Sequence, residues 1–442
     1  MRVFIFIEAR PVECSAIDYI RDLGFSPVLL TSMESMNKGL YDDLRKELFD
    51  NIYYVDTRNS TDIINLIKDN RIPVAAILGC YDDFMIVASE VALEFGLPHP
   101  DIDGLRNAFS KKNVRDILAQ HGYEQPAYEV FSYNNIPENP KVPFPFVIKP
   151  LRDAGAYGVS LCKSQDDYHH VVSEISSNGT MSMLGKVNEE FLIEEFLQGN
   201  FYGAELIYSH DEWHLIGINR IFVSPDDDLC MIGLSHPAEL SEFEFAMACK
   251  FVKEWVAALG LRGGAINVEF IYTSRGPVLV EINLRIAGAR AAQQIFMTSG
   301  INMVKYLVDF VCGIESSISP ASEIVYPFVA DAFVFYRGEG VVNDIRIDTD
   351  IPYFISAGFK KTPFTISLNN QSSSKSKNSS KNKNFGSIVG YVLAYGNSCE
   401  EAMENATRIA NSVQLYPMDF KIDRDGKVTN SREHRELCDR GE

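Results

Sequence analysis

The chain has 442 residues, too many for a single hydrophobic core, and this length predicts about three domains. Hydrophobic residues make up 46% of the chain and charged residues 23%, which is typical of a soluble globular protein. The formal net charge of −19 argues against a nucleic-acid partner, because binding to the phosphate backbone depends on positive charge.

Cysteine spacing and hydropathy indicate where the protein resides. Eight cysteines are spread along the chain without a CxxC pair, so neither a zinc site nor a compact disulfide framework is expected. The N-terminal stretch MRVFIFIEARP has too short an apolar run before Glu8 to be a signal peptide. No apolar run approaches the roughly 20 residues that span a bilayer. We therefore expect a cytoplasmic protein with reduced thiols and no membrane partner.

The first 105 residues alternate between strand and helix patterns. RVFIFI at 2–7 and RIPVAAILGC at 71–80 read as buried strands, and 19–32 reads as a helix, a glycine break and a strand. Residues 82–98 read as a helix that ends at a glycine and a proline. This alternation predicts a parallel α/β domain over 1–105. Its first strand-to-helix loop lacks GxGxxG, so a dinucleotide role has little support.

The remaining chain divides into two further regions. FSKKNVRDILAQH at 109–121 predicts a helix, followed by short strands, glycine-rich loops and a larger α/β region, so that 106–325 forms a second domain. Residues 326–442 predict a C-terminal α+β unit, which includes the strand GSIVGYVLAYG and the helix SCEEAMENATRIANSV. Within this unit, 369–384 contains no apolar side chain and predicts a solvated insertion.

A polar face on an otherwise apolar hairpin is the most informative local pattern. Glu281, Asn283 and Arg285 alternate along VLVEINLRIAG, so they share one face of a strand. The preceding segment AINVEFIYTSRGP predicts a hairpin with a three-residue loop centred on Arg275. This register places Glu269 opposite Glu281 and Asn267 opposite Asn283. On the other, core-like face it places Phe270 opposite Val280 and Tyr272 opposite Val278.

Two facing carboxylates on this hairpin need a compensating cation or a raised pKa. Glu269, Glu281 and Asn283 offer hard oxygen ligands without sulfur or imidazole, and this set suits magnesium rather than zinc. The alternative is an ordinary solvent-facing side of the hairpin on which Glu281 pairs with Arg285.

Two further segments carry candidate nucleotide contacts. In PFPFVIKPLRDAGAYGVSLC at 143–162, Lys149 ends an apolar run, and Gly155 and Gly158 let backbone N–H groups approach phosphate oxygens. This is not the GxxxxGK[ST] pattern, and a plain turn is the alternative. FLIEEFLQG at 191–199 reads, taken alone, as an edge strand that ends at Glu194 and Glu195.

Taken in order, these segments resemble the ATP-grasp superfamily of carboxylate–amine ligases over about residues 1–330. The resemblance is carried by Lys111 with Arg115, VIKP…GAYGV, LIEEFLQG, NVEF and EINLRIAG. It implies an ATP-grasp fold of class α/β. Residues 1–105 would form an N-terminal α/β domain, and 106–325 the ATP-grasp domain with a mobile lid at about 125–192. The C-terminal strand and helix resemble the family's C-terminal unit.

The resemblance also implies roles for single residues. Lys111, or its neighbour Lys112, and Lys149 would reach the ATP phosphates, and Gly155 to Gly158 would form the lid loop. The adenine hinge would be Glu194, Glu195 and Leu197. Phe201 stands where members often carry a ribose-binding glutamate, so Glu205 would take over the ribose contact here. Glu269, Glu281 and Asn283 would bind Mg²⁺ or Mn²⁺, and Arg285 would stabilise an acyl-phosphate.

Within the superfamily, LSHPAEL at 234–240 and EINLRIAGAR resemble the L-amino acid (dipeptide) ligases. His236 and Arg290 are the candidate substrate contacts, with a plain loop residue and a surface salt bridge as the respective alternatives. The implied activity joins a carboxylic acid to an amine through an acyl-phosphate, and dimers are common in the family. A carboxyphosphate-using carboxylase or purine-pathway enzyme, and a non-catalytic nucleotide-binding regulator, are the alternative functions.

Overall fold

The described part of the chain excludes some residues that the sequence singled out. The structure is a computed structural model that describes residues 2–37, 46–151, 158–178, 180–181, 187–224, 227–321, 323, 325–336, 340–362, 364–366, 387–417, 420–422 and 428–430. Gly155 and the insertion at 369–384 lie outside the described residues.

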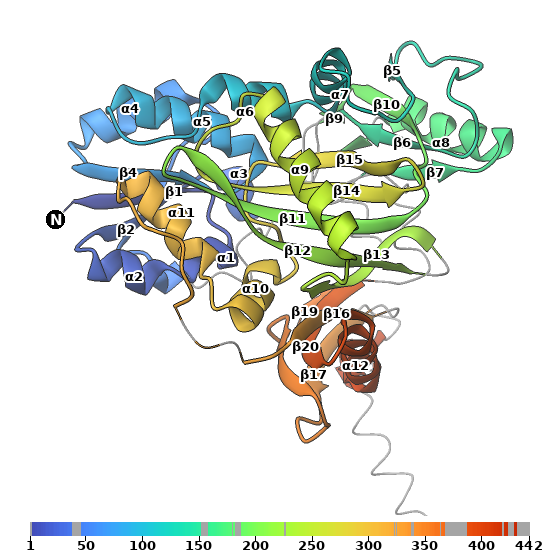
Figure 1. Cartoon of the computed structure of the whole chain (residues 1–442). Coiled ribbons are helices and arrows are strands. Elements are labelled where there is room, and N and C mark those ends of the chain that lie inside the picture. The colour runs from blue at the N-terminus through green and yellow to red at the C-terminus, as the bar shows by residue number, and fades with distance from the viewer. Residues whose placement is uncertain are drawn as a thin grey trace, which may run out of the picture.

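The N-terminal region is a parallel α/β unit, as predicted. Four parallel strands in the order β3-β2-β1-β4 form its sheet. Helices lie on both faces, with α4 and α5 on one side and α2 on the other (Figure 1). Strand β1 is buried at every position, which is typical of a parallel strand covered on both faces. The elements are β1 (Val3–Ile7), α1 (Pro11–Cys14), α2 (Ile17–Asp22), β2 (Ser26–Thr31), α3 (Met33–Asn37), η1 (Lys46–Leu48), β3 (Asn51–Tyr54), α4 (Ser60–Asp69), β4 (Val74–Gly79) and α5 (Asp82–Glu94).

Two helices lead from this unit into a small sheet. The predicted helix at 109–121 is α7 (Lys111–Gln120), and α6 (Ile102–Phe109) precedes it. The small sheet has the order β5-β10-β6-β7, so β10 lies inside it and the edge-strand reading of 191–199 is wrong. The strand is interior because it pairs along one edge with β5 and along the other with β6, and Phe191, Leu192 and Ile193 in it are buried. The elements are β5 (Tyr128–Ser132), β6 (Phe146–Pro150), β7 (Ser160–Cys162), α8 (Gln165–Asn178), β8 (Thr180–Met181), β9 (Val187–Asn188) and β10 (Glu190–Glu195).

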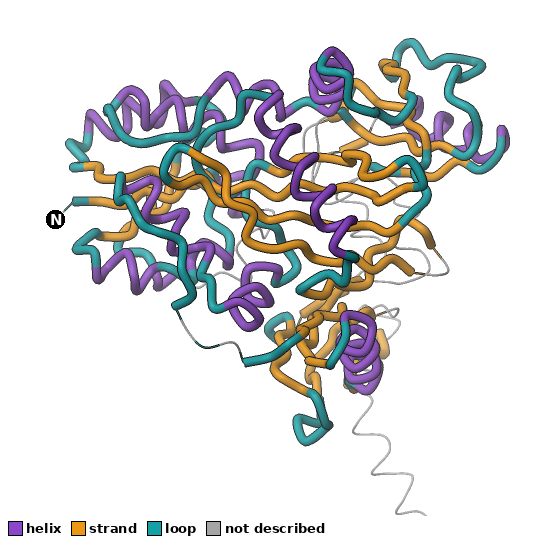
Figure 2. Tube along the Cα trace, in the orientation of Figure 1, coloured by secondary structure: helices purple, strands orange, loops and turns teal. Residues whose placement is uncertain are grey.

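An eight-stranded antiparallel sheet forms the centre of the molecule, in the order β15-β14-β11-β12-β13-β16-β20-β18. Helix α9 lies across one face of it (Figures 1 and 2). Ser241 and Glu244 form a capping box that starts α9, and Trp255 from this helix packs against Phe270 of β14. The other face carries the polar row of the hairpin. The elements are β11 (Asn200–Ser209), β12 (Glu212–Ser224), β13 (Asp227–His236), α9 (Glu242–Ala258), β14 (Ala265–Thr273), β15 (Gly276–Asn283), α10 (Ala291–Ser299) and α11 (Met303–Cys312).

The hairpin of β14 and β15 has the predicted register at its polar end and a different one at its turn. Glu269 pairs with Glu281, and Asn267 pairs with Asn283. The predicted three-residue loop is wrong, because Thr273 pairs with Gly276 and leaves a two-residue turn. Phe270 therefore pairs with Leu279, and Tyr272 with Pro277, instead of Val280 and Val278. A bulge next to Glu269 restores the predicted register beyond it.

The C-terminal elements continue the central sheet. Strand β16 pairs with β13 on one side and with β20 on the other. The central sheet therefore continues across the predicted domain boundary between residues 325 and 326. The predicted C-terminal strand and helix are β20 and α12, and α12 packs on this part of the sheet. The elements are β16 (Phe328–Tyr336), β17 (Gly340–Arg346), β18 (Phe354–Phe359), β19 (Phe364–Ile366), β20 (Ser387–Gly396), α12 (Cys399–Ser412), β21 (Gln414–Pro417), β22 (Phe420–Ile422) and β23 (Val428–Asn430).

Helix length and hydropathy give one more observation. Among the described residues, no single helix is long and apolar enough to cross a membrane. Helices α10 and α11 pass that test only as a pair, and a bend of 106° separates them.

Candidate active site

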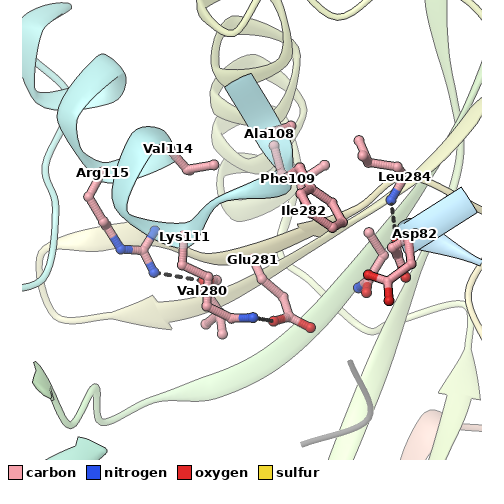
Figure 3. A pocket seen from close by; sticks show the side chains of 12 residues that line it. Asp82, Ala108, Phe109, Lys111, Val114, Arg115, Val280, Glu281, Ile282 and Leu284 are labelled. Atoms are coloured by element: carbon pink, nitrogen blue, oxygen red, sulfur yellow. Dashed lines mark hydrogen bonds and ion pairs between the residues drawn. The ribbon is translucent and has the colours of Figure 1, made fainter. Parts of the chain in front are cut away.

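A recess opens where α5, α7 and β15 meet. It encloses about 540 Å³ of empty space that is continuous with solvent. Side chains from all three parts line it, and Figure 3 shows them converging. The polar residues of the lining are Asp82, Asp83, Lys111, Arg115, Glu281 and Asn283. The recess therefore combines cations from α7 with the oxygen-rich face of the hairpin.

The two neighbouring lysines at the start of α7 point in different directions. The Nζ atom of Lys111 lies 3.1 Å from Oε2 of Glu281 (Figure 3). Lys112 instead pairs with Asp116 on the surface of α7. Of the two candidates for a phosphate contact, Lys111 is the one that lines the recess. Glu281 is paired with Lys111, which differs from the alternative reading of a Glu281–Arg285 pair.

The facing carboxylates Glu269 and Glu281 have opposite pKa shifts. Burial, and next the charge of Glu281, raise the pKa of Glu269 to about 8. Burial alone would raise the pKa of Glu281, but the nearby charges of Lys111 and Lys149 outweigh it and lower this pKa. The pair thus combines one carboxylate that contacts Lys111 with a second, buried carboxyl whose ionisation is disfavoured. With Asn283 beside them, the donors are all oxygen and fit Mg²⁺.

A buried ion triad lies next to the recess. The Nε atom of Arg115 donates to Oε1 of Glu194 at 2.6 Å, and Lys149 pairs with the other carboxylate oxygen. Burial would raise the pKa of Glu194, but the two cations outweigh it and lower this pKa. Burial lowers the pKa of Lys149. Arg115 also donates to the carbonyl of Val280 at 2.7 Å, which ties α7 to β15. The triad carries one net positive charge.

Of the predicted hinge residues, Glu194 belongs to the triad, and Glu195 and Leu197 follow it. The side chain of Glu195 accepts hydrogen bonds from Arg275 at 2.8 Å and from the backbone of Ala127 at 3.2 Å. Leu197 is buried. Gly158, which belongs to the predicted lid loop and not to the hinge, has a φ of +66°, a conformation that favours glycine. Glu194 and Glu195 therefore point to different partners, the first to the lysine of β6 and the second to the surface.

Arg285 is held by a residue that the sequence did not single out. Its Nε atom donates to Oδ2 of Asp82 at 2.7 Å. The backbone of Leu284 donates to the other carboxylate oxygen, Oδ1, at 2.6 Å (Figure 3). Its Nη2 atom donates to Oδ1 of Asn283 at 3.2 Å. Asp82 is the first residue of α5, just beyond the carboxyl end of β4. Ligand sites of parallel sheets gather at that edge, and this was the signal that could have found Asp82.

Glu205 is fully buried beneath the polar face of the hairpin. It accepts hydrogen bonds from Nδ2 of Asn267 at 2.9 Å and from the backbone of Ala287 at 3.3 Å. Burial raises the pKa of Glu205 to about 7. Both of its oxygens thus contact protein groups in the sheet and in the loop after Arg285.

His236 and Arg290 lie outside the lining of the recess. The Nδ1 atom of His236 is 2.5 Å from Oγ1 of Thr298, and burial lowers the pKa of His236 to about 3, so the ring is neutral. The guanidinium of Arg290 lies 3.7 Å from the centre of the Tyr391 ring. This contact is a cation–π interaction rather than the surface salt bridge considered as the alternative.

The sequence of the chain is similar to one family of protein domains and to two other proteins. Residues 142–293 match the ATP-grasp domain family. A protein of Sinorhizobium fredii described as uncharacterized protein y4rH is 26% identical over 325 residues. Carnosine synthase 1 of Homo sapiens is 24% identical over 282 residues. These matches cover 72% and 60% of this chain, but only 65% and 34% of the respective relatives.

Solved structures match over nearly the whole chain. The L-amino acid ligase of Bacillus licheniformis has a TM-score of 0.74 at 15% identity, with 95% of this chain and 99% of that one covered. The biotin carboxylase domain dimer of the Hydrogenobacter thermophilus 2-oxoglutarate carboxylase, in complex with MgADP, ADP and bicarbonate, has a TM-score of 0.66 at 14% identity, with both chains fully covered. The chain therefore contains an ATP-grasp domain and has the fold of the ATP-grasp superfamily of enzymes.

Proposed function

We propose that the protein is an ATP-dependent ligase that joins a carboxylic acid, in particular an amino acid, to an amine. The observation that carries this proposal is the charged cluster at the recess, where Lys111 contacts Glu281, Glu269 lies directly opposite Glu281 on the hairpin, and Arg285 donates to Asn283. The similarity to an L-amino acid ligase over 95% of the chain supports it.

In the proposed reaction, ATP binds with its phosphates next to Lys111 and the triad of Arg115, Glu194 and Lys149. The substrate carboxylate attacks the γ-phosphorus, the bond to the bridging oxygen breaks, and ADP leaves an acyl-phosphate behind. The amine then attacks the acyl carbon, inorganic phosphate departs, and the amine gives up a proton. Phosphoryl transfer needs positioning and charge neutralisation, which the fixed cations provide. Arg285, which Asp82 holds in place, would stabilise the acyl-phosphate.

Glu269, Glu281 and Asn283 would hold Mg²⁺ or Mn²⁺. A divalent cation bound there would neutralise charge on the nucleotide phosphates. The donor set supports this assignment, because Glu269 and Glu281 lie directly opposite each other and Asn283 adds a third oxygen ligand of the kind Mg²⁺ prefers. Glu194, Glu195 and Leu197 remain the predicted adenine hinge.

The test measures ADP release against a matrix of amino acids and other carboxylates combined with amines, with mass analysis of the products. Bicarbonate forms a separate arm, because ADP release that depends on bicarbonate would favour a carboxylase of the kind seen among the similar structures. Tight ATP binding without turnover in any arm would favour a nucleotide-binding regulator. An amide product in the amine arms supports the ligase.

The metal site is tested by Glu281→Ala. We expect this variant to lose ADP formation by about 100-fold or more while its far-UV circular dichroism stays unchanged. Glu404→Ala, an exposed glutamate on α12, is the matched control and should behave as the wild type. Wild-type turnover in Glu281→Ala would refute the site assignment. Sedimentation and cell fractionation test the predicted homodimer and cytoplasmic location.

A further inference from the structure

A row of hydrogen bonds crosses three strands of the central sheet and ends at the proposed metal site. Glu205 on β11, Asn267 on β14 and Asn283 on β15 lie directly opposite one another. Nδ2 of Asn267 donates to Glu205 at 2.9 Å, and Nδ2 of Asn283 donates to Oδ1 of Asn267 at 3.0 Å. Nη2 of Arg285 donates to Oδ1 of Asn283 at 3.2 Å. All three sheet residues are more than nine-tenths buried.

The two ends of this row fix the orientation of both amides between them. An ionised carboxylate, which Glu205 is above its raised pKa of about 7, only accepts hydrogen bonds. A guanidinium only donates them, whereas an amide does both. With Glu205 at one end and Arg285 at the other, each asparagine must turn its nitrogen toward Glu205 and its oxygen toward Arg285. The reverse orientation would place the Asn283 amide nitrogen against the Arg285 guanidinium, with two donors facing each other.

We infer that Glu205 is a positioning residue that presents the Asn283 side-chain oxygen to the divalent cation, acting through Asn267. This inference rests on the proposed function, because it takes Asn283 as a metal ligand. The Asn283 oxygen has two lone pairs, and Arg285 uses one of them. The other is left for the cation, and the orientation that Glu205 sets through Asn267 keeps the oxygen on that side.

Glu269 also accepts from Nδ2 of Asn283, at 3.2 Å, and so favours the same orientation. Its oxygens are themselves proposed ligands, and a bound cation draws on the same lone pairs. Glu205 is separated from Asn283 by Asn267, so its influence persists when the cation is bound. It acts on the ligand through another residue, in the way that outer partners commonly orient metal ligands.

The substitution Glu205→Gln tests this inference by reversing the row. The backbone N–H of Ala287 donates to residue 205 and holds the oxygen of a glutamine on that side. The glutamine nitrogen then faces Asn267, which must turn its own oxygen toward it and its nitrogen toward Asn283. Asn283 would in turn present its nitrogen to Arg285. We expect Mn²⁺ binding in the presence of ADP, measured by calorimetry, to weaken about tenfold.

A second variant distinguishes orientation from mere packing. In Glu205→Gln/Asn267→Asp, the carboxylate at 267 accepts from both the glutamine nitrogen and Nδ2 of Asn283. The row regains its original direction at Asn283, and we expect Mn²⁺ affinity to recover to within about threefold of the wild type. A role of Glu205 in packing alone would leave the double variant no better than the single one.

Asp331→Asn is the matched control. Asp331 is equally buried on the same sheet and likewise accepts one backbone N–H, from Leu234 at 3.2 Å, and one side-chain amide, from Gln294 at 2.9 Å. It has no link to Asn283 in this row, so Mn²⁺ affinity should not change. Unfolding temperatures of all variants exclude global disruption as the cause.

The possible outcomes separate the two proposals. Weakened binding in Glu205→Gln, recovery in the double variant and no change in Asp331→Asn together support the positioning role. Equal binding in wild type and Glu205→Gln, or no recovery in the double variant, overturns it and leaves the metal site standing. A wild-type protein that binds no Mn²⁺ with ADP overturns the metal site and the positioning role together.

Discussion

Glu194→Gln is the substitution for which the structure makes the sharpest statement about stability. The carboxylate of Glu194 is 4% exposed, and its two partners Arg115 and Lys149 are 1% and 6% exposed. A neutral amide leaves two buried cations side by side without an anion. Breaking a buried ion pair from one side costs about 3–5 kcal/mol. For a domain of about 150–250 residues, this loss of stability corresponds to a drop of roughly 6–20 °C in the unfolding temperature.

The neighbouring Glu195→Gln is the matched control. The Glu195 side chain is 31% exposed and that of its partner Arg275 is 41% exposed, so this variant should lose no more than about 1 kcal/mol. Thermal unfolding by circular dichroism measures both variants, and hydrogen exchange in β6 and β10 localises the loss. A Glu194→Gln protein that unfolds within about 2 °C of Glu195→Gln would refute the reasoning.

Bound ATP and a higher pH should both reduce the loss of stability that Glu194→Gln causes. ATP phosphates bring negative charge to the two cations, so ATP should raise the unfolding temperature of this variant more than that of the wild type. Burial already holds the pKa of Lys149 below its unfolded value, and loss of Glu194 lowers it further. The unfolded chain then binds more protons than the folded one, so the stability of the variant rises with pH.

Two other predictions concern the buried polar side of the central sheet. Burial raises the pKa of Asp331 to about 8, so between about pH 4 and 8 the folded state holds a proton that the unfolded state lacks, and stability falls by up to ~1.4 kcal/mol per pH unit. The free energy of unfolding of Asp331→Asn, measured with denaturant, should therefore rise relative to that of the wild type from pH 6 to pH 7.5. A difference in free energy between the two proteins that stays constant over this range would contradict the prediction. A Cβ on Gly217 would lie 2.2 Å from Nε2 of His236, so Gly217→Ala should cost about 1–3 kcal/mol. The cost should largely vanish in a His236→Ala background, and an equal cost in both backgrounds would count against the contact.

For the β14–β15 hairpin, the sequence predicted the polar face and the pairing at its polar end, but not the turn. Alternation along β15 predicted the polar face, because successive strand side chains point to opposite sides. The pairing of Glu269 with Glu281 was correct although the predicted turn was not. A turn shorter by one residue and a bulge at Glu269 cancel each other beyond the bulge. Neither the bulge nor the shorter turn has a signature that the residues alone could decide.

Contacts between distant segments could not be predicted in this way. Asp82 and Arg285 are 203 positions apart, and Arg115 and Glu194 are 79 positions apart. No periodicity links such pairs, since their proximity depends on how α5 and α7 pack against β15. The resemblance supplied candidate residues, but it assigned Glu194 to a hinge without its ion pair to Lys149. It likewise assigned Glu205 a place near ribose without its contact to Asn267.

By itself, the sequence determined the alternation of strands and helices in the N-terminal unit and an oxygen-rich face on the β14–β15 hairpin. These properties depend on the spacing of side chains along single elements, which the backbone geometry of helices and strands sets. Only the tertiary structure decided which charges meet. Lys111 rather than Arg285 pairs with Glu281, Asp82 holds Arg285, and Glu205 lies at the end of the row that orients Asn283. Charge pairing acts over a few ångströms in space, and folding sets those distances independently of separation along the chain.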